Sequence, residues 1–242
     1  MGSSAPELTP RLLRHDRWLV GGGLVVLVAL SWWFLLRGAG MDDHMAMPGM
    51  APPPFGALVL MWWVMMAAMM LPSASPAILL YARVRSQRRD SGMAQPWTFL
   101  AGYLLVWLGF SIAAALLQRE IGSIGDPRLA GGLLVAAGIY QLTPLKQACL
   151  GQCRSPASFI SRHWRAGPLG ALRLGLLHGG FCLGCCWLLM LLLFAGGVMN
   201  YLWVIALTVL VAIEKLIPKG ELLASIAGIA LILWGAVVLV RA

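Results

Sequence analysis

Long, uninterrupted runs of apolar residues constrain the fold of this chain more than any other feature. Seven runs stand out, at 18–36, 57–81, 97–117, 129–145, 174–195, 198–217 and 222–240. A helix needs about 20 apolar residues to cross the hydrocarbon core of a bilayer, and the run at 129–145 is shorter, with Pro144 near its end. Only 11% of the residues are charged, against about 25% in soluble domains. The runs lack the alternation of barrel strands, so the sequence predicts an all-α, polytopic transmembrane helix bundle with about seven spans.

Basic residues are distributed unevenly between these runs. If the N-terminus is cytoplasmic, most of the 18 Lys and Arg residues fall on the cytoplasmic side, as the positive-inside rule requires. We therefore expect a membrane protein with a cytoplasmic tail at 1–17 and a single membrane domain at 18–242. Within that domain we expect an outer loop at 37–56 and a cytoplasmic, Cys-containing segment at 146–173. Membrane topology accounts for the net charge of +9, so we expect the lipid bilayer as a partner and no nucleic acid.

The outer loop is crowded with soft and intermediate metal ligands. Thioethers keep binding metal at low pH because they need no deprotonation, and this mixture suits Cu(I) with some tolerance of Cu(II). The segment is similar to the Met- and His-rich stretches of bacterial periplasmic copper-resistance proteins, although it could also be a plain connector. The candidate ligands are Asp42, Asp43, His44, Met45, Met47 and Met50.

The apolar run at 57–81 carries a second group of methionines at helical spacing, where residues three or four apart are neighbours. Pro72 and Pro76 follow and predict a kinked or broken helix, with Ser73 and Ser75 placed to satisfy some of the freed carbonyls. Methionine is also a common gap filler between helices, so the stripe alone is compatible with plain packing. The stripe comprises Met61, Met65, Met66, Met69 and Met70, of which the last four are our candidate ligands.

All five cysteines lie in the second half of the chain. Cys149 and Cys153 should flank a tight turn after the fourth run, and three more follow near the start of the fifth. A histidine lies one helical turn before the first of these three, so its imidazole can share their face. Such a set suits Cu(I), with Zn(II) or iron as less favoured metals, but thiol–disulfide chemistry and inert buried cysteines stay open. The second group is His178, Cys182, Cys185 and Cys186.

Two ionisable residues end the sixth run. Glu214 is a candidate hard ligand, a proton acceptor, or an ion-pair partner for Lys215, Lys219 or a loop arginine, since a charged residue in a span suggests function. Lys215 could extend to the cytoplasmic surface.

Four segments together resemble a bacterial family of inner-membrane proteins described as predicted metal-binding and of unknown function. The resemblance extends from about Pro54 to Pro218 and implies metal binding, without a settled activity. The segments are Met-Met-x-x-Met-Met-x-Pro ending at Pro72, the stretch from Tyr140 to Lys146 with Cys149 to Pro156, His178 to Met190, and Gly197 to Asn200 leading to Glu214–Pro218.

These features favour a copper-binding membrane protein that captures Cu(I) and transports it or hands it to a periplasmic or membrane protein partner. No ATP-binding motif, phosphorylated-Asp motif or redox-cofactor fingerprint appears in the sequence, so a non-enzymatic function is favoured over an enzyme. Two alternatives remain: a membrane thiol–disulfide oxidoreductase, and a non-catalytic subunit that inserts metal into, or assembles, a partner complex.

Overall fold

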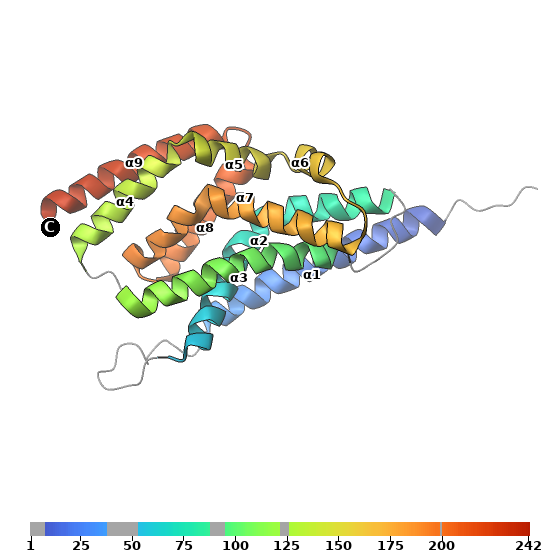
Figure 1. Ribbon diagram of the computed structural model, residues 1–242, viewed down its shortest axis with the longest axis horizontal. Helices are drawn as coiled ribbons and strands as arrows, with labels where there is room; N and C mark the ends of the chain where they lie inside the picture. The colour runs from blue at the N-terminus through green and yellow to red at the C-terminus, as the bar shows by residue number, and fades with distance from the viewer. Residues whose placement is uncertain (1–7, 38–52, 88–94, 122–125, 199) are drawn as a thin grey trace, which may run out of the picture.

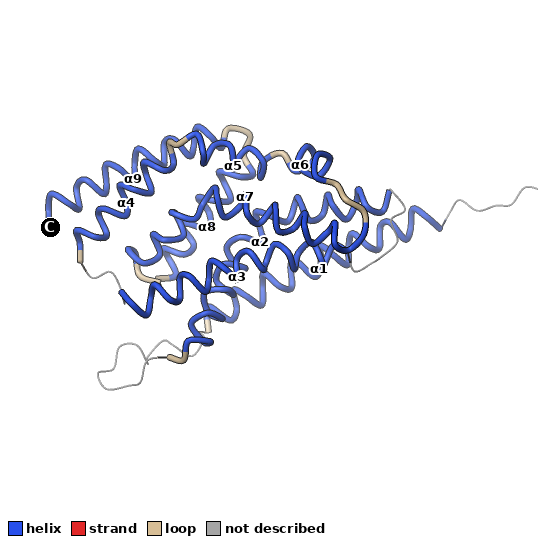
Figure 2. The backbone as a smooth tube through the Cα atoms, in the orientation of Figure 1, coloured by secondary structure: helices blue, strands red, loops and turns tan. Residues whose placement is uncertain are grey.

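The computed structural model describes residues 8–37, 53–87, 95–121, 126–198 and 200–242, which fold into nine helices without a strand (Figures 1 and 2). The all-α prediction is therefore confirmed for the described residues. The helices are α1 (Leu8–Leu36), α2 (Phe55–Gln87), α3 (Gln95–Ile121), α4 (Pro127–Gln141), α5 (Pro144–Arg154), α6 (Pro156–His163), α7 (Gly167–Gly196), α8 (Tyr201–Leu216) and α9 (Gly220–Arg241).

Among the described residues, five helices are long and apolar enough to cross a membrane, namely α1, α2, α3, α7 and α9. Helices α4 and α8 have 15 and 16 residues, which at 1.5 Å per residue is short of a hydrocarbon core about 30 Å thick. The seven spans expected from the apolar runs are therefore not confirmed by helix length.

Local capping explains why these two helices are shorter than the apolar runs. Helix α4 ends at Gln141, because Pro144 begins a new helix and Thr143 caps that helix by accepting a hydrogen bond from the Lys146 backbone N–H. Helix α8 begins only after Gly197, whose φ of 89° ends α7, and Asn200, whose side chain accepts from the Trp203 N–H. Apolar composition thus continues across residues that break the helix.

Helix α2 continues unbroken through its two prolines, contrary to the possibility of a break. Pro76 lacks the N–H that would have bonded to the Pro72 carbonyl. The Ser75 hydroxyl donates to that same carbonyl at 2.8 Å, as expected from the sequence, and the Ser73 hydroxyl donates to the Met70 carbonyl at 2.9 Å. The prolines therefore destabilise this helix less than they would if no serine hydroxyl bonded to the nearby carbonyls.

Helix α3 packs against both α2 and α7, the helices that carry the methionine candidates and the His–Cys candidates (Figure 1). Helices α3 and α7 approach closely through Gly102 and Gly175, where an added Cβ would collide with the backbone of the facing helix. Helix α1 packs mainly on α2, and α8 contacts both α2 and α7. This arrangement encloses the middle of α7 on several sides.

Helices α4 and α9 form a pair beside that bundle, as Figure 1 shows in green and red. Two glycine pairs bring their backbones together: a Cβ on Gly138 would lie 2.6 Å from the Gly228 carbonyl oxygen, and one on Gly235 would lie 2.8 Å from that of Gly131. Small residues of this kind let helices pack without large side chains between them. We call this contact the glycine seam.

Candidate metal centre

The three cysteines and the histidine of α7 are all buried, each at most 2% exposed. Cys182 and Cys186 are four residues apart, so they lie on one face of the helix, and His178 lies one turn before them. The thiols of Cys185 and Cys186 both donate to the Cys182 carbonyl, at 3.1 and 3.0 Å. Helix α7 thus presents its sulfur atoms to the interior of the bundle, as the spacing predicted.

Helix α2 adds a thioether to this group. The Met70 Sδ lies 3.9 Å from the Cys186 Sγ. Helix α8 adds an ammonium group, because the Lys215 Nζ lies 3.0 Å from the Cys182 Sγ and 3.8 Å from the Met70 Sδ. Lys215 is only 6% exposed, so the expectation that it extends to the surface is wrong. We refer to Met70, Cys182, Cys186 and Lys215 as the sulfur cluster.

Two hydroxyl groups complete the surroundings of the sulfur cluster. The Tyr103 hydroxyl of α3 lies 3.0 Å from the Cys182 Sγ and donates to the Met70 carbonyl at 3.4 Å. The Ser73 hydroxyl accepts from the Lys215 Nζ at 3.5 Å. Sequence analysis missed Tyr103, which stands out only as an isolated polar group within an apolar run.

Cys149 and Cys153 lie on helix α5, not at the tight turn that the sequence suggested. Pro144 and its cap start that helix early enough to include both residues. The Cys153 thiol lies near enough to Cys182 and Cys185 to interact electrostatically with their thiols. The Cys149 Sγ packs against Gly184 of α7, and partial burial raises the pKa of the Cys149 thiol. Cysteines of α5 and α7 thus meet, although they lie far apart in the sequence.

The His178 imidazole is enclosed by aromatic rings. Its ring centroid lies 5.9 Å from that of Phe99, 5.8 Å from that of Tyr103 and 5.3 Å from that of Phe159. Its Nδ1 atom is buried without a hydrogen-bond partner among the described residues. An unpartnered buried nitrogen one turn before Cys182 is compatible with a ligand role.

The other candidate methionines of α2 are buried in the core of the bundle. Met65, Met66 and Met69 are each at most 1% exposed, as is Met61. The candidates Asp42, Asp43, His44, Met45, Met47 and Met50 lie outside the described residues.

Glu214 lies in a different polar network from the one that we expected. Its Oε2 pairs with the Lys146 Nζ at 2.6 Å, and its Oε1 accepts from the Gln141 Nε2 at 2.7 Å. Among the described residues, Glu214 therefore pairs with neither Lys215, Lys219 nor an arginine, because the break after α4 turns Lys146 of α5 inward. We call Gln141, Lys146 and Glu214 the ion-pair network.

Within the described residues, no three His, Cys, Asp or Glu side chains are placed to hold one metal ion together. The contact of 3.9 Å between the Cys186 and Met70 sulfur atoms, from different helices, instead includes a thioether, which lies outside those four residue types. A metal in the sulfur cluster would therefore be held by two thiols and one thioether, a soft set.

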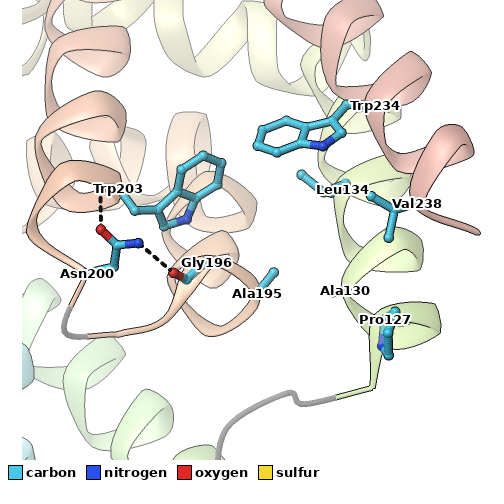
Figure 3. A pocket seen from close by; sticks show the side chains of 9 residues that line it. All are labelled: Pro127, Ala130, Leu134, Ala195, Gly196, Asn200, Trp203, Trp234 and Val238. Atoms are coloured by element: carbon cyan, nitrogen blue, oxygen red, sulfur yellow. Dashed lines mark hydrogen bonds between the residues drawn. The ribbon is translucent and has the colours of Figure 1, made fainter. Parts of the chain in front are cut away.

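A separate pocket of about 470 Å³ lies between the ends of α4, α7, α8 and α9 (Figure 3). Figure 3 shows Trp203 and Trp234 beside it, and Asn200 bonded to Gly196 and Trp203. None of its nine lining residues carries a sulfur atom, an imidazole or a carboxylate. It is unsuited to a soft metal ion.

Comparison with known proteins identifies the family. A family model described as PpoB2, copper chaperone, matches residues 59–238. Neither a curated protein nor a solved structure gives a match. The matched residues include the sulfur cluster and the ion-pair network but not the candidate ligands at 42–50. Because the model covers most of the chain, this protein belongs to the PpoB2 copper chaperone family.

Proposed function

We propose that this protein is a membrane-embedded copper chaperone that holds Cu(I) between Met70, Cys182 and Cys186. The observation that carries the proposal is the buried contact of 3.9 Å between the Met70 thioether of α2 and the Cys186 thiol of α7, with Lys215 in contact with both Met70 and the Cys182 thiol. Thiolate and thioether are the ligands that favour Cu(I) among the common metals. The family description supports copper as the cargo.

Binding would exchange hydrogen bonds for metal bonds. The Cys186 thiol now donates to the Cys182 carbonyl, and a thiol must lose its proton to ligate a metal. Rotation about one side-chain bond frees the Cys186 sulfur from that carbonyl and leaves the helix backbone unchanged. His178 is a further candidate ligand, because its unpartnered Nδ1 lies one turn away on the same helix.

The sulfur atoms also outline a route for copper. Met65, Met66 and Met69 precede the sulfur cluster along α2 and are buried, and the half-buried Cys149 and Cys153 of α5 would continue the route. We infer that the loop at 42–50 captures copper outside and that the ion moves inward through these ligands. Thiolates bind Cu(I) more strongly than thioethers, so ligand strength rises in that direction.

We place the chain in the bacterial inner membrane with a cytoplasmic N-terminus and a single membrane domain at 18–242. The five long apolar helices and the distribution of basic residues support this placement. Helices α4 and α8 then lie within the bilayer as shorter segments. The recipient of the copper is a protein in the same membrane or in the periplasm.

The test is copper stoichiometry in detergent-purified protein after anaerobic loading with Cu(I). We expect bound copper in the wild type and its loss in the Cys182→Ser, Cys186→Ser double variant. Cys149→Ser is the comparison variant: its thiol is a later position on the proposed route and not a ligand of the sulfur cluster, so copper held at the cluster should be retained. Equal copper in the double variant and the wild type would refute this ligand set.

The same preparations separate copper handling from thiol–disulfide chemistry, which the contact between Cys153, Cys182 and Cys185 makes chemically feasible. An oxidoreductase would form a disulfide when a partner disulfide is added, with that partner reduced to its dithiol, and would return to the thiol form when a partner dithiol is added. We expect metal-bound thiols and no such cycling.

A further inference from the structure

Lys215 is a buried lysine in the sulfur cluster, and within the described part of the chain its positive charge is not balanced by a carboxylate as that of a buried lysine usually is. Lys215 has no carboxylate within ion-pairing distance among the described residues. The adjacent Glu214 carboxylate is occupied, with both oxygens bound by Gln141 and Lys146. A buried charge is costly unless an opposite charge compensates it. The groups that face the Lys215 ammonium are the two cluster sulfurs at 3.0 and 3.8 Å and the neutral Ser73 hydroxyl.

The net charge of the loaded site follows from its ligands. Cys182 and Cys186 contribute two negative charges when they bind metal as thiolates, and Met70 contributes none. Lys215 contributes one positive charge, so the protein groups together carry a single negative charge. A monovalent cation such as Cu(I) brings the total to zero, whereas a divalent cation such as Zn(II) leaves one positive charge in a medium of low dielectric constant.

We propose that Lys215 is the specificity-determining residue of this site and selects a monovalent soft cation over a divalent one. The inference rests on the proposed function, because it takes the sulfur cluster as the copper site. Lys215 selects by charge alone and need not touch the metal. The ion-pair network cannot do this, since Lys146 and Glu214 cancel each other within it.

The test compares two affinities in each of four purified proteins. Cu(I) and Zn(II) are titrated separately against chromogenic chelators, without oxygen for Cu(I), in the wild type and in Lys215→Leu, Lys215→Arg and Lys219→Leu. Leucine removes the charge without adding a ligand, and arginine keeps the charge. Lys219→Leu removes an equal charge from an exposed residue four positions further on.

In Lys215→Leu we expect the ratio of Cu(I) affinity to Zn(II) affinity to fall about tenfold, because the ammonium repels a divalent ion more strongly than a monovalent one and the variant removes that repulsion. Lys215→Arg should keep the wild-type ratio to within about threefold, and Lys219→Leu should change neither affinity.

A parallel fall of both affinities in Lys215→Leu would show a structural role and overturn the inference, as would an unchanged ratio. If Lys215→Leu does not fold, Lys215→Gln removes the same charge with a polar side chain and is judged by the same ratio. If the wild type binds no Cu(I), the proposed function itself is overturned. If the wild type binds Cu(I) but Lys215→Leu leaves the affinity ratio unchanged, only the role of Lys215 is overturned.

Discussion

Glu214 and Lys215 are adjacent in the sequence, yet they belong to two buried polar networks of opposite character. Glu214 faces α4 and α5, where Lys146 balances its charge and Gln141 occupies its second oxygen. Lys215 faces α2 and α7, where its ammonium meets sulfur atoms and no carboxylate among the described residues. Successive residues of a helix point about 100° apart, so one turn of α8 serves both networks.

The ion-pair network has all its charges matched within the protein, whereas the sulfur cluster has a charge that ligand binding can match. In the ion-pair network, charges and hydrogen-bond partners are matched within the protein, so a cation entering there would disturb a balanced pair. In the sulfur cluster, the positive charge is matched only when the thiols are ionised, which is the form that binds metal. We therefore assign stability to the first network and binding to the second.

Breaking the ion-pair network should have the largest effect on the free energy of unfolding. Glu214→Gln leaves the fully buried Lys146 ammonium without its partner, and we expect a loss of about 3–5 kcal/mol. Denaturant titration in detergent micelles measures this loss. Cu(I) bound per folded molecule should stay the same.

A double variant sharpens that experiment. Replacing both partners, by Lys146→Met with Glu214→Leu, removes the unpaired charge and should recover most of the lost stability. If Glu214→Gln instead keeps its stability and loses copper, Glu214 is a metal ligand and our division between the two networks is wrong.

In the sulfur cluster, we expect Met70→Leu to lower Cu(I) affinity by about tenfold, since one soft ligand is lost. The change conserves volume, so the free energy of unfolding should fall by less than about 1.5 kcal/mol. Met61→Leu is the matched control, being an equally buried member of the same stripe more than two turns away, and should leave the affinity unchanged. Equal affinities for the two variants would remove Met70 from the ligand set. Chelator competition provides the readout.

The smallest effect is expected for Tyr103→Phe. This variant loses the hydroxyl that lies 3.0 Å from the Cys182 Sγ, and one hydrogen bond corresponds to a drop in Cu(I) affinity of roughly threefold. Tyr140→Phe is the control: it removes an α4 hydroxyl that donates to the Gly184 carbonyl of α7, the helix that carries Cys182. This variant should not alter Cu(I) affinity. A loss in both variants would point to a general loosening of α7.

Much of the helical architecture could be predicted because apolar runs, prolines and caps act locally. The helix class follows from composition, and the shared face of His178, Cys182 and Cys185 was predicted from spacing, whereas the contact of Cys186 with Met70 was not. The extent of α4 and α8 was overestimated, since hydropathy does not register Thr143, Gly197 or the other residues that end a helix.

The partners of the charged residues could not be predicted, because they depend on packing between distant helices. Lys146 and Glu214 are 68 positions apart, and Lys215 and Cys182 are 33 apart. No local pattern shows that neighbouring residues of α8 face different helices. The meeting of α5 with α7 through Cys153 is of the same kind.

The glycine seam between α4 and α9 has a consequence for biosynthesis. The four glycines pack against the backbone and side chains of the opposite helix, and all of α5 to α8 separates the two helices in the sequence. Helix α4 therefore leaves the ribosome well before α9 is synthesised. Until then, its small-residue face must contact lipid or an insertion factor. We expect a chain stopped before Gly220 to expose that face and to be degraded rapidly, even though every residue of the sulfur cluster is already present.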